Sequence, residues 1–167
     1  MALMTGEQYL ESMRKLKLNI YMFGEKIENS ESSPILRPSL NSVKATYDLA
    51  ADPQYEDVMT AVSHLTGEKI NRFTHIHQST DDLIKKVKMQ RLCGSKTACC
   101  FQRCVGLDAF NAVYSTTYEV DEKYGTSYFE NFKKFLTYVQ QNDLTVDGAM
   151  TDPKGNRGLA PSAQADP

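Results

Sequence analysis

The chain has 167 residues, of which 41% are hydrophobic and 24% are charged, and its formal net charge is −2 at pH 7. A chain of this length can bury one ordinary hydrophobic core, so we expect one main folded unit with at most a short appended piece. Because positive and negative residues are evenly mixed, a nucleic-acid partner is not expected. No apolar run approaches the roughly 20 residues that span a bilayer, so a membrane partner is not expected either.

The first part of the chain predicts helices joined by loops. Thr5-Gly6-Glu7-Gln8 has the form of a capping box, and apolar residues follow it at helical spacing. Pro53 stands at the start of a later helical stretch, where proline is tolerated. Helices are expected over about residues 6–17, 39–52 and 53–62, a short strand over 19–24, and a loop over 28–38.

The middle of the chain predicts longer helices. Ser79 or Thr80 can cap a helix, and Gly125-Thr126 is expected to end another. The Lys- and Arg-rich residues 85–91 are interpreted as the solvated face of a helix. We expect a turn over about residues 66–70 and helices over 79–94, 96–123 and 127–141.

The pattern changes after Asn142. Residues 144–150 are typical of a strand, and residues 151–157 form a polar turn with Pro and Gly. A lone strand leaves backbone groups unpaired on both edges, so we expect the chain to be the front part of a longer protein. The prediction is a mainly α fold with two parts, a helical domain over residues 1–142 and the start of a truncated β domain over residues 143–167.

Four cysteines, Cys93, Cys99, Cys100 and Cys104, lie within twelve positions of one another. Such crowding disfavours disulfides, and with no secretory signal at the N-terminus it indicates a cytoplasmic protein. If residues 96–123 form one helix, Cys100 and Cys104 project from one face with Cβ atoms roughly 5–6 Å apart. That spacing fits two thiolates of an iron–sulfur cluster better than zinc, although buried structural cysteines remain an alternative.

His75 and His77 would share one face of an extended segment, where two histidines can bind a metal. We favour the interpretation that they are hydrogen-bonded loop residues. Cys93 and Cys99 are likewise interpreted as structural.

Four segments carry a resemblance to a known family: residues 78–83, 85–92, 100–106 and 148–155. Together they are similar to the flavin-containing 4-hydroxyphenylacetate 3-monooxygenase family, whose fold resembles acyl-CoA dehydrogenases, and within it to the members that dehydrate an acyl-CoA. The similarity runs from about Met4 to Pro167. It implies an N-terminal helical domain that leads into a middle β domain.

The resemblance also implies cofactors and a reaction. Cys100 and Cys104 would be two ligands of a 4Fe–4S cluster whose other ligands lie beyond Pro167, and Gln102 would lie close to cluster and substrate. The implied activity is dehydration of 4-hydroxybutyryl-CoA to crotonyl-CoA with vinylacetyl-CoA isomerisation, in a homotetramer; flavin would assist removal of a proton β to the thioester and iron would bind the leaving hydroxyl. No catalytic residue is assigned within the chain, which is expected to be inactive alone. The segment that would contact FAD consists of Met150, Thr151, Asp152, Pro153, Lys154, Gly155, Asn156 and Arg157.

The chain departs from the family pattern at two of these positions. Cys99 stands where a serine is usual, which raises the question whether Cys99 or Cys100 is the ligand; the match of Phe101-Gln102-Arg103-Cys104 favours Cys100. Asn156 stands where an aspartate is usual. Two alternatives remain open: a cluster-free flavin-dependent aromatic hydroxylase of the same superfamily, and a non-catalytic zinc-binding or redox module.

Overall fold

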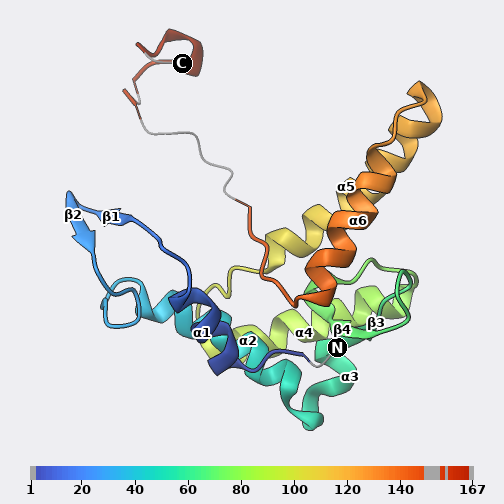
Figure 1. The fold of residues 1–167 in the computed structure, drawn as a ribbon, viewed down its shortest axis with the longest axis horizontal. Coiled ribbons are helices and arrows are strands. Elements are labelled where there is room, and N and C mark those ends of the chain that lie inside the picture. The colour runs from blue at the N-terminus through green and yellow to red at the C-terminus, as the bar shows by residue number, and fades with distance from the viewer. Residues whose placement is uncertain (1–2, 149–154, 157, 166–167) are drawn as a thin grey trace.

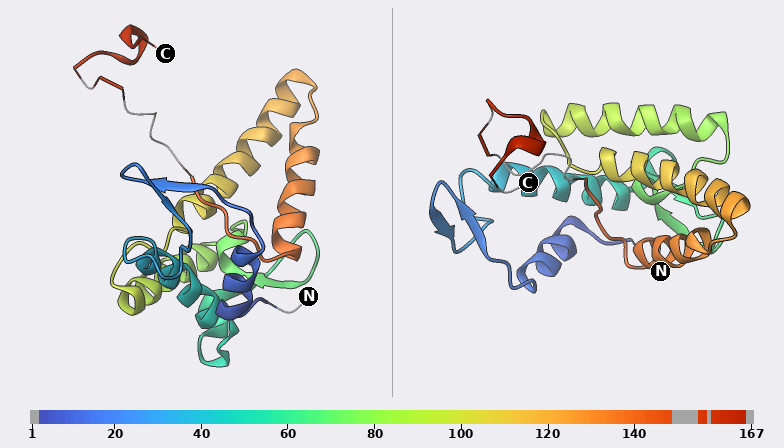
Figure 2. Two further views of the ribbon diagram at one scale, coloured as in Figure 1. Left: turned by 60° about the vertical axis from the view of Figure 1, so that its left-hand side comes forward. Right: turned by 90° about the horizontal axis from the view of Figure 1, so that it is seen from above.

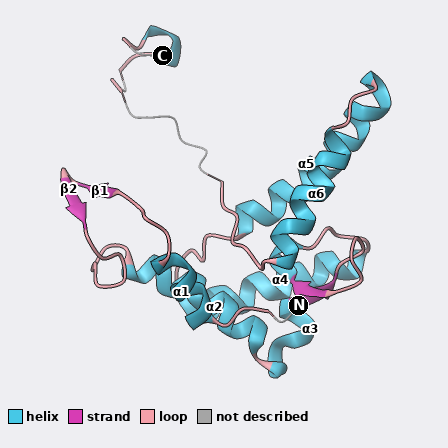
Figure 3. Cartoon of the chain, in the orientation of Figure 1, coloured by secondary structure: helices cyan, strands magenta, loops and turns pink. Residues whose placement is uncertain are grey.

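A computed structural model of the chain describes residues 3–148, 155, 156 and 158–165. Helices dominate these residues, which confirms the predicted mainly α fold (Figures 1 and 3). None of the described helices has the length and hydrophobicity needed to cross a membrane. The α-helices are α1 Gly6–Arg14, α2 Arg37–Ala51, α3 Glu56–Met59, α4 Thr80–Thr97, α5 Cys104–Tyr124 and α6 Tyr128–Gln141; the strands are β1 Ile20–Met22, β2 Glu25–Ile27, β3 Thr60–Val62 and β4 Lys69–Asn71; short 3-10 helices are η1 Pro53–Tyr55, η2 Arg72–Thr74 and η3 Pro161–Ala163.

The helix ends follow the predicted capping residues. The Thr5 side chain accepts from the Gln8 backbone and the Gln8 side chain accepts from the Thr5 backbone, so the capping box at α1 is confirmed. Ser79 caps α4 by accepting from the backbone N–H of Asp82. Gly125, in the left-handed conformation with φ 65°, ends α5 as predicted.

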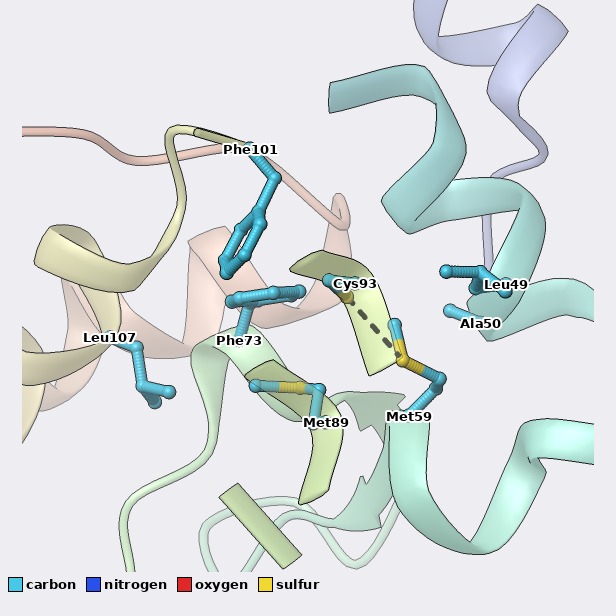
Figure 4. Close-up of a cluster of buried hydrophobic side chains, with 8 residues drawn as sticks. All are labelled: Leu49, Ala50, Met59, Phe73, Met89, Cys93, Phe101 and Leu107. Carbon is cyan, nitrogen blue, oxygen red and sulfur yellow. Dashed lines mark hydrogen bonds between the residues drawn. The ribbon is translucent and has the colours of Figure 1, made fainter. Parts of the chain in front are cut away.

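The helices pack in two groups. α1 lies against α2 and α2 lies against α4, whereas α5 and α6 form an antiparallel pair that projects from the rest (Figures 1 and 2). One interior cluster joins the groups, and Phe73 from η2 meets Phe101 there with ring centroids 5.6 Å apart (Figure 4). Its buried members are Leu49, Ala50, Met59, Phe73, Met89, Cys93, Phe101 and Leu107.

Two β-hairpins interrupt the helical order. β1 pairs with β2 where only one strand was expected, and Phe23 (φ 53°) and Gly24 (φ 84°) form the turn between them. The prediction of a helix through Val62 is wrong, because α3 ends at Met59 and Thr60–Val62 form β3. The predicted turn over residues 66–70 is confirmed for residues 66–68, where Gly67 has a φ of 72°, whereas Lys69 and Ile70 belong to β4. β3 pairs with β4 with Ala61 opposite Ile70, and this pairing buries Ile70 almost completely. β-branched residues in β3 and β4 favour the paired strands.

The prediction of one helix over residues 96–123 is wrong. α4 continues past Gly94 to Thr97 and stops at Ala98, whose φ of 53° is left-handed. Residues 99–103 are not helical, and Gln102 has a φ of 61°. Phe101 and Arg103 both enter the interior. Residues two apart on an α-helix point in nearly opposite directions, so a continuous helix would expose one of them.

The predicted strand over residues 144–150 is not present in its described part, residues 144–148. A strand needs a hydrogen-bonded neighbour, and the described residues here pack on helices instead. Leu144 and Val146 contact the cluster formed by Phe110, Leu136 and their neighbours between α5 and α6. Ala149 and Met150 lie outside the described residues.

Candidate functional site

The candidate cluster ligands lie on the connection between α4 and α5. Cys100 is exposed in this connection, and Cys104, half-buried, is the first residue of α5. The predicted geometry, two thiols on one face of a continuous helix, is therefore wrong. The two thiols nevertheless belong to a single five-residue segment that leads directly into a long helix.

Buried and accessible residues alternate along this segment, and the candidate residues are the accessible ones. Phe101 and Arg103 are buried, whereas Cys100, Gln102 and Cys104 remain accessible. Phe101 packs on Phe73, so the interior holds the segment at that position. The three residues that the resemblance assigns to cluster and substrate are thus the three whose side chains are left free to meet a ligand.

Cys99 points toward a different partner. Its Sγ lies 2.7 Å from Oγ of Ser42 on α2, and its carbonyl oxygen accepts a hydrogen bond from Thr97. These contacts support the structural interpretation of Cys99. Cys93 is fully buried in the interior cluster, and burial raises the pKa of its thiol to about 11. A thiol held protonated in this way is a poor metal ligand, which supports its structural interpretation.

Gln102 borders an apolar cavity of about 180 Å³ between α1, β1 and α2. Its amide and the hydroxyl groups of Tyr9, Ser30 and Ser39 contribute polar side-chain atoms to the lining residues. The remaining lining residues are apolar: Met13, Leu18, Ile20, Leu36, Leu40 and Val43. The residue placed near the substrate by resemblance therefore lies at the edge of a mainly apolar cavity.

The described residues contain no group of three or more His, Cys, Asp or Glu side chains arranged to hold a metal ion. Cys100 and Cys104 are two thiols from one short segment, and the assignment of a cluster to them stays a prediction.

The histidines are occupied by structural contacts. His75 is buried with Nε2 3.1 Å from Oδ1 of Asp82, and the backbone N–H of His77 donates to Asn111. Burial lowers the pKa of His75, and the neighbouring carboxylate opposes only part of that shift. His75 and Asp82 border a surface cavity of about 470 Å³ whose lining includes none of the cysteines. The loop is therefore held by the His75–Asp82 contact and the His77 backbone hydrogen bond, while Nδ1 of His75 and Nε2 of His77 are buried without a hydrogen-bond partner among the described residues.

A buried charge pair next to the cysteines was not expected from the sequence. The guanidinium of Arg103 stacks between the rings of Tyr47, at 4.4 Å, and Phe73, at 4.8 Å. Its Nη1 donates to Thr46 and its Nη2 lies 3.9 Å from Oδ1 of Asp143. Burial raises the pKa of Asp143, and Arg103 opposes that shift. Arginine is normally exposed, so only the structure reveals this interior position.

Most of the candidate FAD segment lies outside the described residues, namely Met150, Thr151, Asp152, Pro153, Lys154 and Arg157. Gly155 and Asn156 are described and exposed. Gln164 Oε1 accepts from the backbone N–H of Asn156, and the Gln164 side-chain amide donates to the Asn156 carbonyl. The FAD assignment therefore stays a prediction.

Comparisons with known proteins agree with the sequence resemblance. The chain is 70% identical over 165 residues to the 4-hydroxybutyryl-CoA dehydratase/vinylacetyl-CoA-Δ-isomerase of Clostridium aminobutyricum, covering 99% of this chain and 34% of that protein. It is 29% identical to the oxygenase component of 4-hydroxyphenylacetate 3-monooxygenase of Thermus thermophilus, covering 98% of this chain and 33% of that protein. The chain thus spans about a third of the length of the relatives it matches.

Solved structures show the same relationship. An oxygen-tolerant archaeal 4-hydroxybutyryl-CoA dehydratase from N. maritimus superposes with a TM-score of 0.89 at 49% identity, over 99% of this chain and 33% of that one. An oxygenase component of 4-hydroxyphenylacetate 3-monooxygenase, solved with FAD and 4-hydroxyphenylacetate, gives a TM-score of 0.69 at 24% identity and shares the fold, over 98% of this chain and 33% of that one. The family described as 4-hydroxyphenylacetate 3-hydroxylase N terminal matches residues 5–167, and the chain belongs to this family.

Proposed function

We propose that the chain is the N-terminal part of a lyase that dehydrates 4-hydroxybutyryl-CoA to crotonyl-CoA and isomerises vinylacetyl-CoA, using FAD and a 4Fe–4S cluster. The observation that carries the proposal is the 70% identity, over 99% of the chain, to a dehydratase of that name. The thiols support it, because Cys100 is exposed and Cys104 is only half-buried, so both remain accessible to a ligand.

The proposal assigns roles to residues of this chain. Cys100 and Cys104 would supply two thiolate ligands of the cluster, and Gln102 would orient the substrate acyl group at the apolar cavity that it borders. The residues 150–157 bind FAD through Lys154, Arg157 and backbone groups. When bound, the flavin assists removal of the poorly acidic proton β to the thioester and the iron acts as a Lewis acid toward the leaving hydroxyl.

The protein interior fixes the position of the cysteine segment. Phe101 and Arg103 anchor the cysteine segment from inside, so the thiols need little ordering when a cluster binds. We also propose that the residues up to 142 form the helical domain and residues 143–167 begin a β domain. The chain alone is then expected to be inactive, because the family resemblance implies that the other cluster ligands lie beyond Pro167.

A flavin-dependent aromatic hydroxylase is the competing function, since the Thermus relative of that name is 29% identical. A hydroxylase of this kind has no use for iron at Cys100 and Cys104. A zinc-binding or redox module without catalysis would hold zinc or no metal and would not retain FAD. Iron, zinc and flavin contents therefore separate the three functions.

The proposed setting is a cytoplasmic homotetramer that takes part in 4-aminobutyrate degradation. All four cysteines are free thiols, which suits a reducing compartment. The setting otherwise rests on the resemblance.

The test uses the full-length protein, a polypeptide of the relatives' length that contains this chain, purified without oxygen. Cys104→Ser and Cys100→Ser are each expected to lower iron and sulfide content together with dehydration of 4-hydroxybutyryl-CoA. Cys99→Ser is the matched control, because Cys99 Sγ contacts Ser42, and it is expected to keep both. Full iron occupancy in Cys104→Ser, or a wild-type protein that holds FAD but no iron, contradicts the proposal.

A further inference from the structure

The segment after α6 lies directly against the start of α5. A Cβ atom added to Gly106 would overlap the carbonyl oxygen of Val146. A Cβ atom added to Gly148 would come 2.6 Å from Cγ1 of Val105. Gly106 thus allows the Val146 backbone to approach α5 more closely than a larger residue would, and Gly148 leaves room for the Val105 side chain.

Buried polar contacts join the same two segments. Arg103 faces Asp143 across 3.9 Å, and both side chains are buried. The Tyr47 hydroxyl donates to the Asp143 carbonyl oxygen at 2.8 Å and shares a second 2.8 Å hydrogen bond with Thr145. Since Tyr47 also stacks on Arg103, one tyrosine of α2 contacts both segments. The hydrogen bonds and ring contact of Tyr47 therefore hold the two segments together, in addition to their close packing.

These contacts lie between the two candidate cofactor segments. Arg103, Val105 and Gly106 flank Cys104 on the cluster side. Asp143, Val146 and Gly148 precede Met150, where the candidate FAD segment begins. We call these six residues the clasp.

We propose that the clasp sets the separation between the cluster-binding cysteines and the FAD-binding segment, so that its members are positioning residues for both cofactors. The inference rests on the proposed function. Two cofactors that act on one substrate must be held within about half an ångström of their productive places. The connection over residues 99–103 and the irregular segment over residues 143–148 are not rigid enough alone. Their contacts with each other and with the start of α5 provide the rigidity.

The test compares two helical glycines in the full-length protein. Gly106→Ala forces the Val146 backbone away from α5, whereas Gly94→Ala in α4 adds a methyl group that meets nothing within 4 Å. Gly106→Ala is expected to weaken FAD retention roughly tenfold and to lower iron content, since a displacement of about an ångström is enough for such losses. Gly94→Ala is expected to leave FAD, iron and the visible flavin spectrum as in the wild type.

A second pair of variants guards against simple loss of folding. Gly148→Ala alone meets Val105, but with Val105→Ala the added methyl lies 3.8 Å from the remaining Cβ, an ordinary contact. The double variant is therefore expected to recover the FAD content, iron content and flavin spectrum that Gly148→Ala loses. Met59→Ala, a truncation in the interior cluster away from the clasp, should lower the melting temperature without changing the flavin spectrum.

The outcomes separate the clasp from the proposed function. Wild-type cofactor contents and spectrum in Gly106→Ala overturn the clasp, as does a double variant that recovers nothing. If the wild-type protein holds neither cofactor, the proposed function fails, and thermal unfolding then tests whether the clasp residues hold the two segments together. A melting temperature that is lower in Gly148→Ala than in the wild type and is restored in the double variant then supports the close approach of the two segments. Equal melting temperatures of Gly148→Ala and the wild type overturn it.

Discussion

Arg103 and Asp143 face each other in the interior with Nη2 and Oδ1 3.9 Å apart, because the antiparallel α5–α6 pair brings the residue before α5 and the segment after α6 to the same end. Two aromatic rings cover the guanidinium, and only about 1% of the Arg103 side chain is exposed. A buried charge is tolerated only with a partner, so each residue depends on the other. The start of α5 and the segment after α6 are therefore coupled energetically.

Arg103→Met is expected to destabilise the protein by about 3–5 kcal/mol, because Asp143 would remain buried without its cation. Urea unfolding of the full-length protein measures this loss. The double variant Arg103→Met/Asp143→Asn should be more stable than the single one, since no unpaired charge remains. Equal stability of the single variant and the wild type would show that the pair contributes nothing.

Tyr47→Phe is expected to cost about 1–3 kcal/mol, because the ring keeps its packing on Tyr9 but the buried Asp143 carbonyl and Thr145 hydroxyl lose a partner. The control is Tyr128→Phe, whose ring is more than half exposed. Thermal unfolding compares the two. A change no larger than that of Tyr128→Phe would contradict the proposed strength of these hydrogen bonds.

The sequence predicted the elements whose signals are local. The capping box at Thr5, the cap at Ser79 and the stop at Gly125 each depend on a few neighbouring residues, and the structure has all three. The β3–β4 hairpin depends on pairing between residues such as Ala61 and Ile70 that are apart in sequence. Helical propensity near Pro53 therefore gave the wrong answer beyond Met59.

The geometry predicted for the candidate site was wrong, and the assignment of its residues stays a prediction. Nothing local stops a helix at Ala98; the break follows from Phe101 and Arg103, which both gain burial only if the chain leaves the helix. The i,i+4 argument for Cys100 and Cys104 failed for this reason. A buried arginine gives no signal in sequence, so its role as an anchor required the structure.

Arg157→Ala in the full-length protein is expected to weaken FAD retention roughly ten- to hundredfold, because a charge-assisted hydrogen bond contributes about 1.5–3 kcal/mol. Flavin absorbance after desalting measures the retained cofactor. Asn156→Asp, which restores the usual family residue, should leave retention unchanged or improved. Full flavin and activity in Arg157→Ala would show that residues 150–157 are only a surface connection.

The stability of the protein is expected to fall in acid through Asp82. Its Oδ1 lies 3.1 Å from His75 and 3.3 Å from the buried Arg72, and its Oδ2 accepts from Gln78 and Ser79. Partial burial alone would raise the pKa of this carboxyl. The hydrogen bonds from Gln78, His75 and Ser79 outweigh burial and lower the pKa to about 2.

The lowered pKa fixes the direction of the effect. In the unfolded chain, the Asp82 carboxylate takes up a proton near its ordinary pKa of 3.8. In the folded chain, it stays ionised until the pH falls to about 2. The stabilisation from Asp82 is thus complete above about pH 4 and is lost as the pH falls through 2. Allowing for the partial exposure of the group, we expect a contribution on the order of 1–2 kcal/mol.

Urea unfolding between pH 2 and 7 measures this dependence. Asp82→Asn should be less stable than the wild type above pH 4, and the difference should shrink between pH 4 and 2 because the wild type loses its advantage there. Asp81→Asn, one position earlier on the same turn of α4 and well exposed, is the matched control and should follow the wild-type curve closely. Parallel curves for Asp82→Asn and the wild type across the whole range would mean that the Asp82 carboxylate is not held by these hydrogen bonds.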